Sequence, residues 1–251
     1  MSLTDAGEVF LHYAREITRQ REGYEIALRK LADSRENTIA LGVLPTMAQY
    51  DITNIIFTYQ RKYPKTKLSL TMADTYDLQS LLEEGTLDFA FLRVSEGKKQ
   101  DESLSSTIIC EDELVAVIPV SNPLARCESI TLSQLRNEDI CVLETNTLIY
   151  DLCVEHCKNA GFEIRIFYHG HHLTNIADFV TKGQAVALLM REQTRFMRNP
   201  KIKVISVDPP IKTLLCFCYS RTRRFGEAAS NFVDTVNKFI KTGSPEIEKP
   251  F

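Results

Sequence analysis

The sequence predicts an α/β protein made of two similar units that follow one long helix. Short runs of alternating or continuous apolar residues, typical of strands, take turns with segments whose apolar residues recur at helical spacing. This order occurs twice along the chain, and it implies parallel sheets with right-handed crossovers. The first 36 residues differ, because their apolar residues recur every seven positions and show no strand pattern.

The N-terminal segment predicts a helix that pairs with a partner helix. One row of its seven-residue repeat contains Phe10, Ile17, Tyr24 and Leu31, and the neighbouring row contains Tyr13, Gln20, Ala27 and Ser34. A helix with such a seam and no core of its own favours association with another helix. Its half-polar second row makes the seam modest. The alternative is an ordinary amphipathic helix that packs on its own domain.

The first unit is expected over residues 37–118. Its expected strands are 39–43, 68–72, 87–92, 108–109 and 114–118. A helix is expected to begin at Pro45 and Thr46 and to stop at Pro64, and a second one to end at Gly85. The polar residues 95–106 are expected to form a loop.

The second unit repeats this pattern over residues 119–214. Its expected strands are 140–143, 163–168, 185–190 and 204–207. Thr131 and Thr147 are suited to cap helices, the second of which runs to Ala160, and a further helix is expected over 174–182. A strand at 214–219 and an amphipathic helix follow, and residues 244–251 read as a loose tail.

Composition and charge narrow the class of protein. With 44% apolar and 25% charged residues, the 251-residue chain is typical of a globular protein. It shows neither an apolar run near 18 residues nor a signal peptide, so we expect no membrane partner and a cytoplasmic location. A net charge of −3 argues against direct binding of DNA by these residues, since proteins that neutralise phosphates usually present a basic face.

The seven cysteines do not predict a disulfide framework, because their number is odd and no secretory signal is seen. Most lie in apolar, strand-like runs, where cysteine usually acts as a small buried hydrophobe. Cys153 and Cys157 stand one helical turn apart, which is a weak zinc signal without a second pair of ligands. We therefore expect packing there, and we expect no metal or other cofactor.

Several motifs, in this order along the chain, resemble those of LysR-type transcriptional regulators. Leu3-Thr4-x-Ala6-Gly7-Glu8 looks like the segment that closes their winged helix-turn-helix and begins their dimerising linker helix. Four later stretches are similar to family motifs over essentially the whole chain: Tyr63-Pro64, residues 85–90, residues 114–124 and residues 180–189. The last stretch departs from the family's usual Gly-x-Gly-x-Ala form, because Gln184 and Ala185 replace the second glycine.

The resemblance implies two Rossmann-like lobes of the type 2 periplasmic binding protein fold, joined by two crossing strands, with a ligand cleft between them. It divides the chain into a linker helix (1–36), lobe 1 (37–118 and 215–243), lobe 2 (119–214) and a tail (244–251). The last helix would then return to lobe 1. The implied function is a ligand-sensing regulatory domain that binds a small polar or anionic metabolite. It would act as a homodimer or tetramer and would contact DNA only through an N-terminal domain that this chain lacks.

Three segments that follow strands are candidates for binding this effector. In open α/β sheets, ligands bind beyond the carboxyl ends of the strands, where helix N-termini offer free N–H groups. The candidate residues in these segments, which also match the family's effector cleft by position, are Thr46, Met47, Thr145, Asn146, His169 and His171. Thr46 is equally suited to cap a helix, and Asn146 to form a turn. The histidines suit the lining of a loop or cleft, direct contact with the effector, or a metal site.

Enzyme motifs are absent from the sequence: it shows no nucleophile elbow, zinc-protease helix, phosphate-binding loop or dinucleotide fingerprint. We therefore expect that the chain is not an enzyme. The alternative is a solute-binding protein or a small enzyme on the same fold, because a fold by itself does not decide function.

Overall fold

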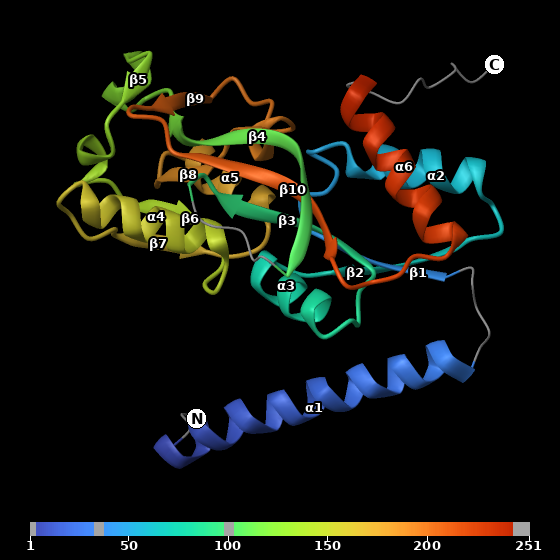
Figure 1. Cartoon of the computed structure of the whole chain (residues 1–251). Coiled ribbons are helices and arrows are strands. Elements are labelled where there is room, and N and C mark those ends of the chain that lie inside the picture. Colours follow the sequence, from blue (N-terminus) through green and yellow to red (C-terminus); the bar gives the residue numbers. More distant parts are fainter. Residues whose placement is uncertain (1–3, 33–37, 98–102, 243–251) are drawn as a thin grey trace.

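A computed structural model describes residues 4–32, 38–97 and 103–242 of the chain. It shows two α/β lobes and one long helix, α1 (Asp5–Ala32), that lies outside them (Figure 1). Within the described residues, every helix is too short or too polar to span a lipid bilayer.

Lobe 1 is built on a five-stranded sheet. The order of its strands is β2 (Lys67–Met72), β1 (Thr38–Val43), β3 (Phe89–Ser95), β10 (Lys212–Ser220) and β4 (Leu104–Pro119). The first three are parallel, and β10 is antiparallel to β3 and β4. Three helices complete the lobe: α2 (Ile52–Lys62), α3 (Thr75–Glu83) and α6 (Glu227–Thr242).

The last helix packs on lobe 1, as the resemblance implies. Phe232 of α6 is fully buried, and its ring lies 5.4 Å from that of Phe89 and 5.0 Å from that of Tyr59. The Tyr59 hydroxyl also donates a hydrogen bond to the Ala228 carbonyl at 2.9 Å. One aromatic core therefore joins α6, the last described helix, to α2 and β3.

The C-terminal part of β4, residues 114–119, belongs to the sheet of lobe 2. In its sheet β4 lies between β9 (Ile202–Val207) and β8 (Val186–Met190), and beyond β8 follow the parallel strands β6 (Ile140–Val142) and β7 (Ile166–His169). The short strand β5 (Ser129–Ile130) pairs with β9. One core underlies α4 (Leu148–Asn159) and the 3-10 helices η1 (Pro123–Arg126) and η2 (Leu132–Leu135), and a second underlies α5 (Leu173–Thr181).

The two lobes are connected by β4 and β10, which run side by side between them (Figure 1). The sequence predicts two separate strands at 108–109 and 114–118, and this prediction is wrong: β4 is one strand of 16 residues. The acidic residues Glu111, Asp112 and Glu113 interrupt the apolar pattern, but their backbones pair with β10 like those of their neighbours. Backbone pairing, which the side-chain pattern does not report, decides the length of this strand.

The helix predicted to begin at Pro45 and Thr46 in fact begins at Ile52. Residues 45–51 form hydrogen-bonded turns, in which the Met47 N–H donates to the Leu44 carbonyl at 3.0 Å. Thr46 therefore does not cap the helix. The buried apolar stripe, which packing on lobe 1 requires, starts only at Ile52. In contrast Thr147 caps α4 as predicted, since its hydroxyl accepts a hydrogen bond from the Tyr150 N–H at 3.2 Å.

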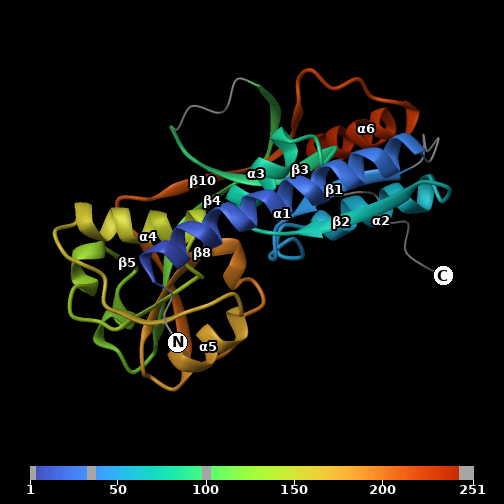
Figure 2. The ribbon, with the colours of Figure 1, turned by 90° about the horizontal axis from the view of Figure 1, so that it is seen from below.

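Helix α1 runs below α3 in Figure 1, and Figure 2 shows it crossing from lobe 1 toward lobe 2, with its N-terminal end on the side of lobe 2. An ion pair between Arg19 Nε and Glu84 Oε1, at 3.2 Å, joins α1 to the end of α3. The seam residues of α1 are mostly exposed, with between 55% and 74% of each accessible: Phe10, Tyr13, Ile17 and Tyr24. Pairing of this seam with a second helix stays a prediction. The side chain of Leu31 and the tail at 244–251 lie outside the described residues.

Candidate functional site

A pocket lies between the lobes and is lined by residues from six segments of the chain. Lobe 1 contributes the residues after β1, the start of α3 and the middle of β3; lobe 2 contributes the residues between β6 and the start of α4, the loop before α5 and the 3-10 helix η3 (Arg191–Thr194). The lining residues are Leu44, Pro45, Thr46, Asp74, Thr75, Arg93, Leu143, Thr147, Leu148, Ile149, His171 and Gln193. Its free volume of about 30 Å³ leaves room for about two water molecules, so the lobes are nearly closed on one another.

Arg93 is the most unusual residue of the pocket, because its guanidinium is charged and almost fully buried. Only 2% of the residue is exposed. Its Nη1 donates to Thr213 Oγ1 at 2.6 Å and lies 3.7 Å from Asp112 Oδ2. The buried Nη2 has no hydrogen-bond partner among the described residues. The guanidinium thus has one side anchored in the protein and a second donor left for a ligand.

Asp112 anchors Arg93 and is itself held by three donors. The Tyr50 hydroxyl donates to its Oδ2 at 2.5 Å, and the backbone N–H groups of Glu113 and Glu192 donate to its Oδ1. The Tyr50 ring also lies 4.8 Å from the Arg93 guanidinium, within the range of a cation–π contact. Burial strongly raises the pKa of Tyr50, which keeps its hydroxyl a donor. These contacts fix Arg93 before any ligand arrives.

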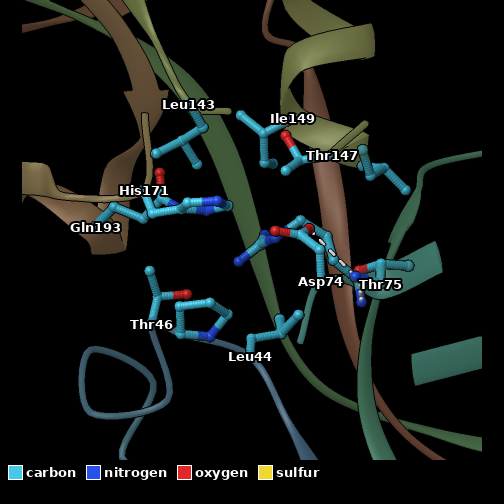
Figure 3. Close-up of a pocket in the computed structure, with 12 residues that line it drawn as sticks. Leu44, Thr46, Asp74, Thr75, Leu143, Thr147, Ile149, His171 and Gln193 are labelled. Atoms are coloured by element: carbon cyan, nitrogen blue, oxygen red, sulfur yellow. Dashed lines mark hydrogen bonds between the residues drawn. The ribbon is translucent and has the colours of Figure 1, made fainter. Parts of the chain in front are cut away.

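Asp74 brings a negative charge to the same pocket. It caps α3, where its Oδ1 accepts a hydrogen bond from the Thr75 N–H at 3.1 Å. Burial raises the pKa of this carboxyl; the hydrogen bond from Thr75 and the charges of His171 and Arg93 oppose that rise. Figure 3 shows Thr46, Asp74, Thr147 and His171 arranged around one space.

The start of α4 forms the lobe 2 wall of the pocket. Thr147 caps this helix, and Leu148 and Ile149 are its first two residues. The first N–H groups of a helix have no acceptor within the helix, and they mark the positive end of its dipole. The pocket therefore offers an anion both a helix N-terminus and the Nη2 group of Arg93.

Of the six residues predicted to contact an effector, Thr46 and His171 line this pocket. The side chain of Met47 packs partly buried against the core of lobe 1 instead. His169 is the last residue of β7, so it does not share a strand face with His171, as it would if the strand continued.

The other three predicted residues lie outside the lining and have structural roles around Glu144. His169 Nδ1 lies 2.7 Å from Glu144 Oε1, and the same oxygen accepts hydrogen bonds from the Thr145 N–H and hydroxyl. The Thr145 N–H, followed by His169, lowers the pKa of the Glu144 carboxyl. Asn146 has a positive φ of 62°, which fits the turn that the sequence offered as its alternative role.

The sequence did not single out Asp74, Arg93 or Gln193. No motif marks them, because each reaches the pocket from a different element: the start of α3, the middle of β3 and the 3-10 helix η3. One signal was available for Arg93. It is the single charged residue in the otherwise apolar run 89–94, and a charge in a buried strand requires a partner.

The cysteines and histidines do not assemble a metal site in the part of the chain that the structure describes, where no three His, Cys, Asp or Glu side chains cluster. Cys153 and Cys157 are both buried in the core of lobe 2, and burial raises the pKa of Cys157 to about 11. Their role is packing, as the sequence suggested.

A second, wider hollow of about 580 Å³ lies between α6, η3 and residues 49–51. Tyr50 borders it and also lies against Arg93, so the two hollows share a wall. Arg93 lines the interlobe pocket, and its buried Nη2 has no acceptor among the described residues. We therefore take the interlobe pocket as the candidate site.

Comparison with known proteins gives a consistent result. A family model described as the LysR substrate binding domain matches residues 32–240. The transcriptional dual regulator GltC of Bacillus subtilis is 22% identical over 242 residues, which are 96% of this chain and 80% of GltC. The DNA-binding transcriptional dual regulator OxyR of Escherichia coli is 23% identical over 186 residues, or 74% of this chain and 60% of OxyR.

Solved structures show the same fold. The effector binding domain of QuiR in complex with shikimate matches 82% of this chain and 98% of its own, with a TM-score of 0.69 and 16% identity. A full-length mutant of BenM matches 97% of this chain and 80% of its own, with a TM-score of 0.71 and 18% identity. At these identities the likeness establishes the fold and not the ligand.

Proposed function

The chain belongs to the LysR substrate-binding domain family, and on that premise we propose that it senses a small polar or anionic metabolite in its interlobe pocket. It is the effector-binding domain of a LysR-type regulator and has the type 2 periplasmic binding protein fold. The observation that carries the proposed ligand chemistry is the buried Nη2 of Arg93, which has no partner among the described residues.

Closure of the two lobes is the conformational change that the ligand would stabilise. Among the contacts that cross between the lobes are two between side chains: the Tyr76 hydroxyl donates to Asp151 Oδ2 at 2.8 Å, and Arg195 Nη1 lies 3.1 Å from Asp51 Oδ2. Both are exposed and therefore weak by themselves. A ligand shifts such an equilibrium only if it binds the closed form more tightly than the open form. Contacts from both lobes to one ligand meet this condition.

The signal would pass from the lobes to α1 and from there to a DNA-binding domain. We infer that two copies of α1 pair through the exposed seam, so that a homodimer or tetramer forms, and that DNA is contacted only through a domain preceding α1. Such a regulator acts where the DNA is, which for this family means the cytoplasm. Because the relatives are regulators of transcription, we propose no catalytic role, and a solute-binding protein or a small enzyme is not favoured.

The proposal retains Thr46 and His171 as direct contacts with the effector, since both line the pocket. Met47, Thr145, Asn146 and His169 lie outside the lining, and they stay predictions for an effector that extends beyond the pocket.

A screen for ligands tests this function. Metabolites are screened by thermal shift on the purified 251-residue chain, and each hit is titrated by calorimetry on Thr46→Ala and His171→Ala. Thr235→Ala is the matched control, because Thr235 is a similar side chain in α6, outside the lining, and is not a candidate contact. We expect a true effector to lose affinity with the first two variants and to keep it with the control. A ligand that binds all variants equally would show that the pocket is not the effector site.

A further inference from the structure

The charges in the pocket specify the effector further. We propose that the effector is a small α-amino acid in its zwitterionic form, with its carboxylate on Arg93 and its ammonium group on Asp74. This inference rests on the proposed function, because it takes the interlobe pocket as the effector site. It replaces the broad class of polar or anionic metabolites with one arrangement of two opposite charges.

The carboxylate end follows from the state of Arg93. Its Nη1 is occupied by Thr213 and lies near Asp112, and Tyr50 stacks against the guanidinium, so the side chain is fixed in position. Its Nη2 is buried and has no acceptor among the described residues. A carboxylate is the strongest small-molecule acceptor for such a donor. The N-terminus of α4, in the opposite wall, provides further N–H groups for the same anion.

The ammonium end follows from Asp74. This carboxyl lines the pocket and accepts one hydrogen bond, from the Thr75 N–H. Burial raises its pKa, which means that the surroundings disfavour its negative charge. An ammonium group in the pocket would stabilise that charge and donate to it.

The charge balance of the pocket decides between a zwitterion and a simple anion. The charged or titratable residues in its lining are Asp74, Arg93 and His171. Asp112, behind the lining, already balances the charge of Arg93. While the imidazole of His171 is neutral, the pocket therefore carries the net charge of Asp74. A simple carboxylate would add a second negative charge beside Asp74, whereas a zwitterion adds none and places its cation against Asp74.

The remaining lining limits the side chain of the amino acid. Apolar side chains make up nearly half of the lining residues: Leu44, Pro45, Leu143, Leu148 and Ile149. This favours an aliphatic side chain over a charged one. Because the free volume of about 30 Å³ holds only about two water molecules, the lobes have to move apart to admit even a small amino acid.

The test uses matched probes. Calorimetry at pH 7 measures the affinity of the chain for each of the twenty L-amino acids. The tightest is then compared with two analogues, one without the amino group and one without the carboxylate; for L-valine these are 3-methylbutanoate and 2-methylpropan-1-amine. We expect an amino acid to bind and each analogue to bind at least thirtyfold more weakly.

Two variants test the role of Asp74. Asp74→Asn removes the charge but keeps a side chain that caps α3 well, so the helix is preserved. We expect this variant to bind the amino acid at least tenfold more weakly. It should bind the analogue that lacks the amino group as tightly as the wild-type chain does, or more tightly. The matched control is Asp77→Asn, which makes the same change in the first turn of α3 at an exposed position outside the lining. We expect the control to leave all affinities unchanged.

The outcomes separate this inference from the function on which it rests. If no amino acid binds, or if a carboxylate without an amino group binds most tightly and Asp74→Asn strengthens it, the zwitterion is refuted. In the second case the pocket stays the effector site, provided that Thr46→Ala weakens that ligand. A ligand that is insensitive to both Thr46→Ala and Asp74→Asn refutes the site and the zwitterion together.

Discussion

The hydrogen bond between Tyr76 and Asp151 gives a test of lobe closure that removes a single oxygen atom. It joins α3 of lobe 1 to α4 of lobe 2 at 2.8 Å. Hydrogen bonds to charged groups contribute about 1.5–3 kcal/mol when well sheltered. Because Tyr76 is 41% exposed, we take about 1 kcal/mol for this one, which corresponds to about a fivefold change in the ratio of closed to open forms.

We therefore expect Tyr76→Phe to weaken effector binding about fivefold when the free protein is mostly open, since binding then requires closure. Calorimetric titration of the effector measures this change. Tyr168→Phe is the control, because the Tyr168 hydroxyl accepts a hydrogen bond from Asn175 within lobe 2 alone. In Asp151→Ala, the additional change Tyr76→Phe should have little further effect, because the partner is already gone. Unchanged or tighter binding by Tyr76→Phe would refute the idea that this contact stabilises the closed form.

The same contact predicts a dependence on pH at the alkaline end. Burial, followed by the hydrogen bond to Asp151 and its charge, raises the pKa of Tyr76 to about 12 in the closed form. The closed form favours the neutral hydroxyl. The stabilisation of the closed form by this hydrogen bond is therefore fully present below about pH 10, and it is lost as pH rises through about 12. Burial also raises the pKa values of Tyr50 and Tyr59, so absorbance of tyrosinate should show one fewer late-titrating tyrosine in Tyr76→Phe than in the wild-type chain. If the tyrosine missing from the titration curve of Tyr76→Phe is one that titrates at the usual pKa of tyrosine, this prediction is contradicted.

Three further substitutions test the core, a helix cap and the linker helix. Phe232→Ala should lower the free energy of unfolding in urea by about 3–5 kcal/mol, because removal of the fully buried ring leaves a cavity in lobe 1. Phe196→Ala is the control: at a 62% exposed position, it should change the free energy of unfolding by less than about 0.5 kcal/mol. Thr147→Ala should lower stability by about 1 kcal/mol in thermal denaturation through loss of the α4 cap, and no change would show that the cap is not needed. Ile17→Glu should reduce the mass of the oligomer in light scattering, because it puts a charge into the α1 seam. Arg15→Glu on the same helix is its control. A mass unchanged by Ile17→Glu would refute pairing through the seam.

The sequence predicts the order of the helices and strands well, because the spacing of apolar residues along each segment indicates its type. The cap at Thr147 was predictable in detail, since a threonine just before an apolar helix has a local partner three residues on. Thr46 shows the limit of this reasoning. It precedes an apolar helical stripe in the same way, but the turns at 45–51 separate it from the helix. Packing on lobe 1 sets that boundary, and packing is not a local property.

The candidate site was predictable in position but only partly in its residues. Strand ends and helix starts led to six candidate residues, two of which line the pocket, and effector binding by any of them stays a prediction. The pair of opposite charges was missed because Arg93 lies within a strand and Asp74 looks like an ordinary cap. Their shared pocket depends on how the two lobes meet, which no single segment of the sequence records.

The continuity of β4 restricts how the length of this protein can vary. Leu114, Ala116 and Ile118 face one core of lobe 2, and Val117 faces the other. The pairing of β4 with β10 shifts register at Ile109, and it is regular from Cys110 to Glu113. Since side chains alternate along a strand, one residue inserted between Cys110 and Leu114 would either turn these side chains to the wrong cores or break this pairing. We expect the short connection between α2 and β2 to accept insertions, while the regularly paired part of β4 before Leu114 accepts none. The number of residues in β4 between its two halves thus sets the distance between the two lobes.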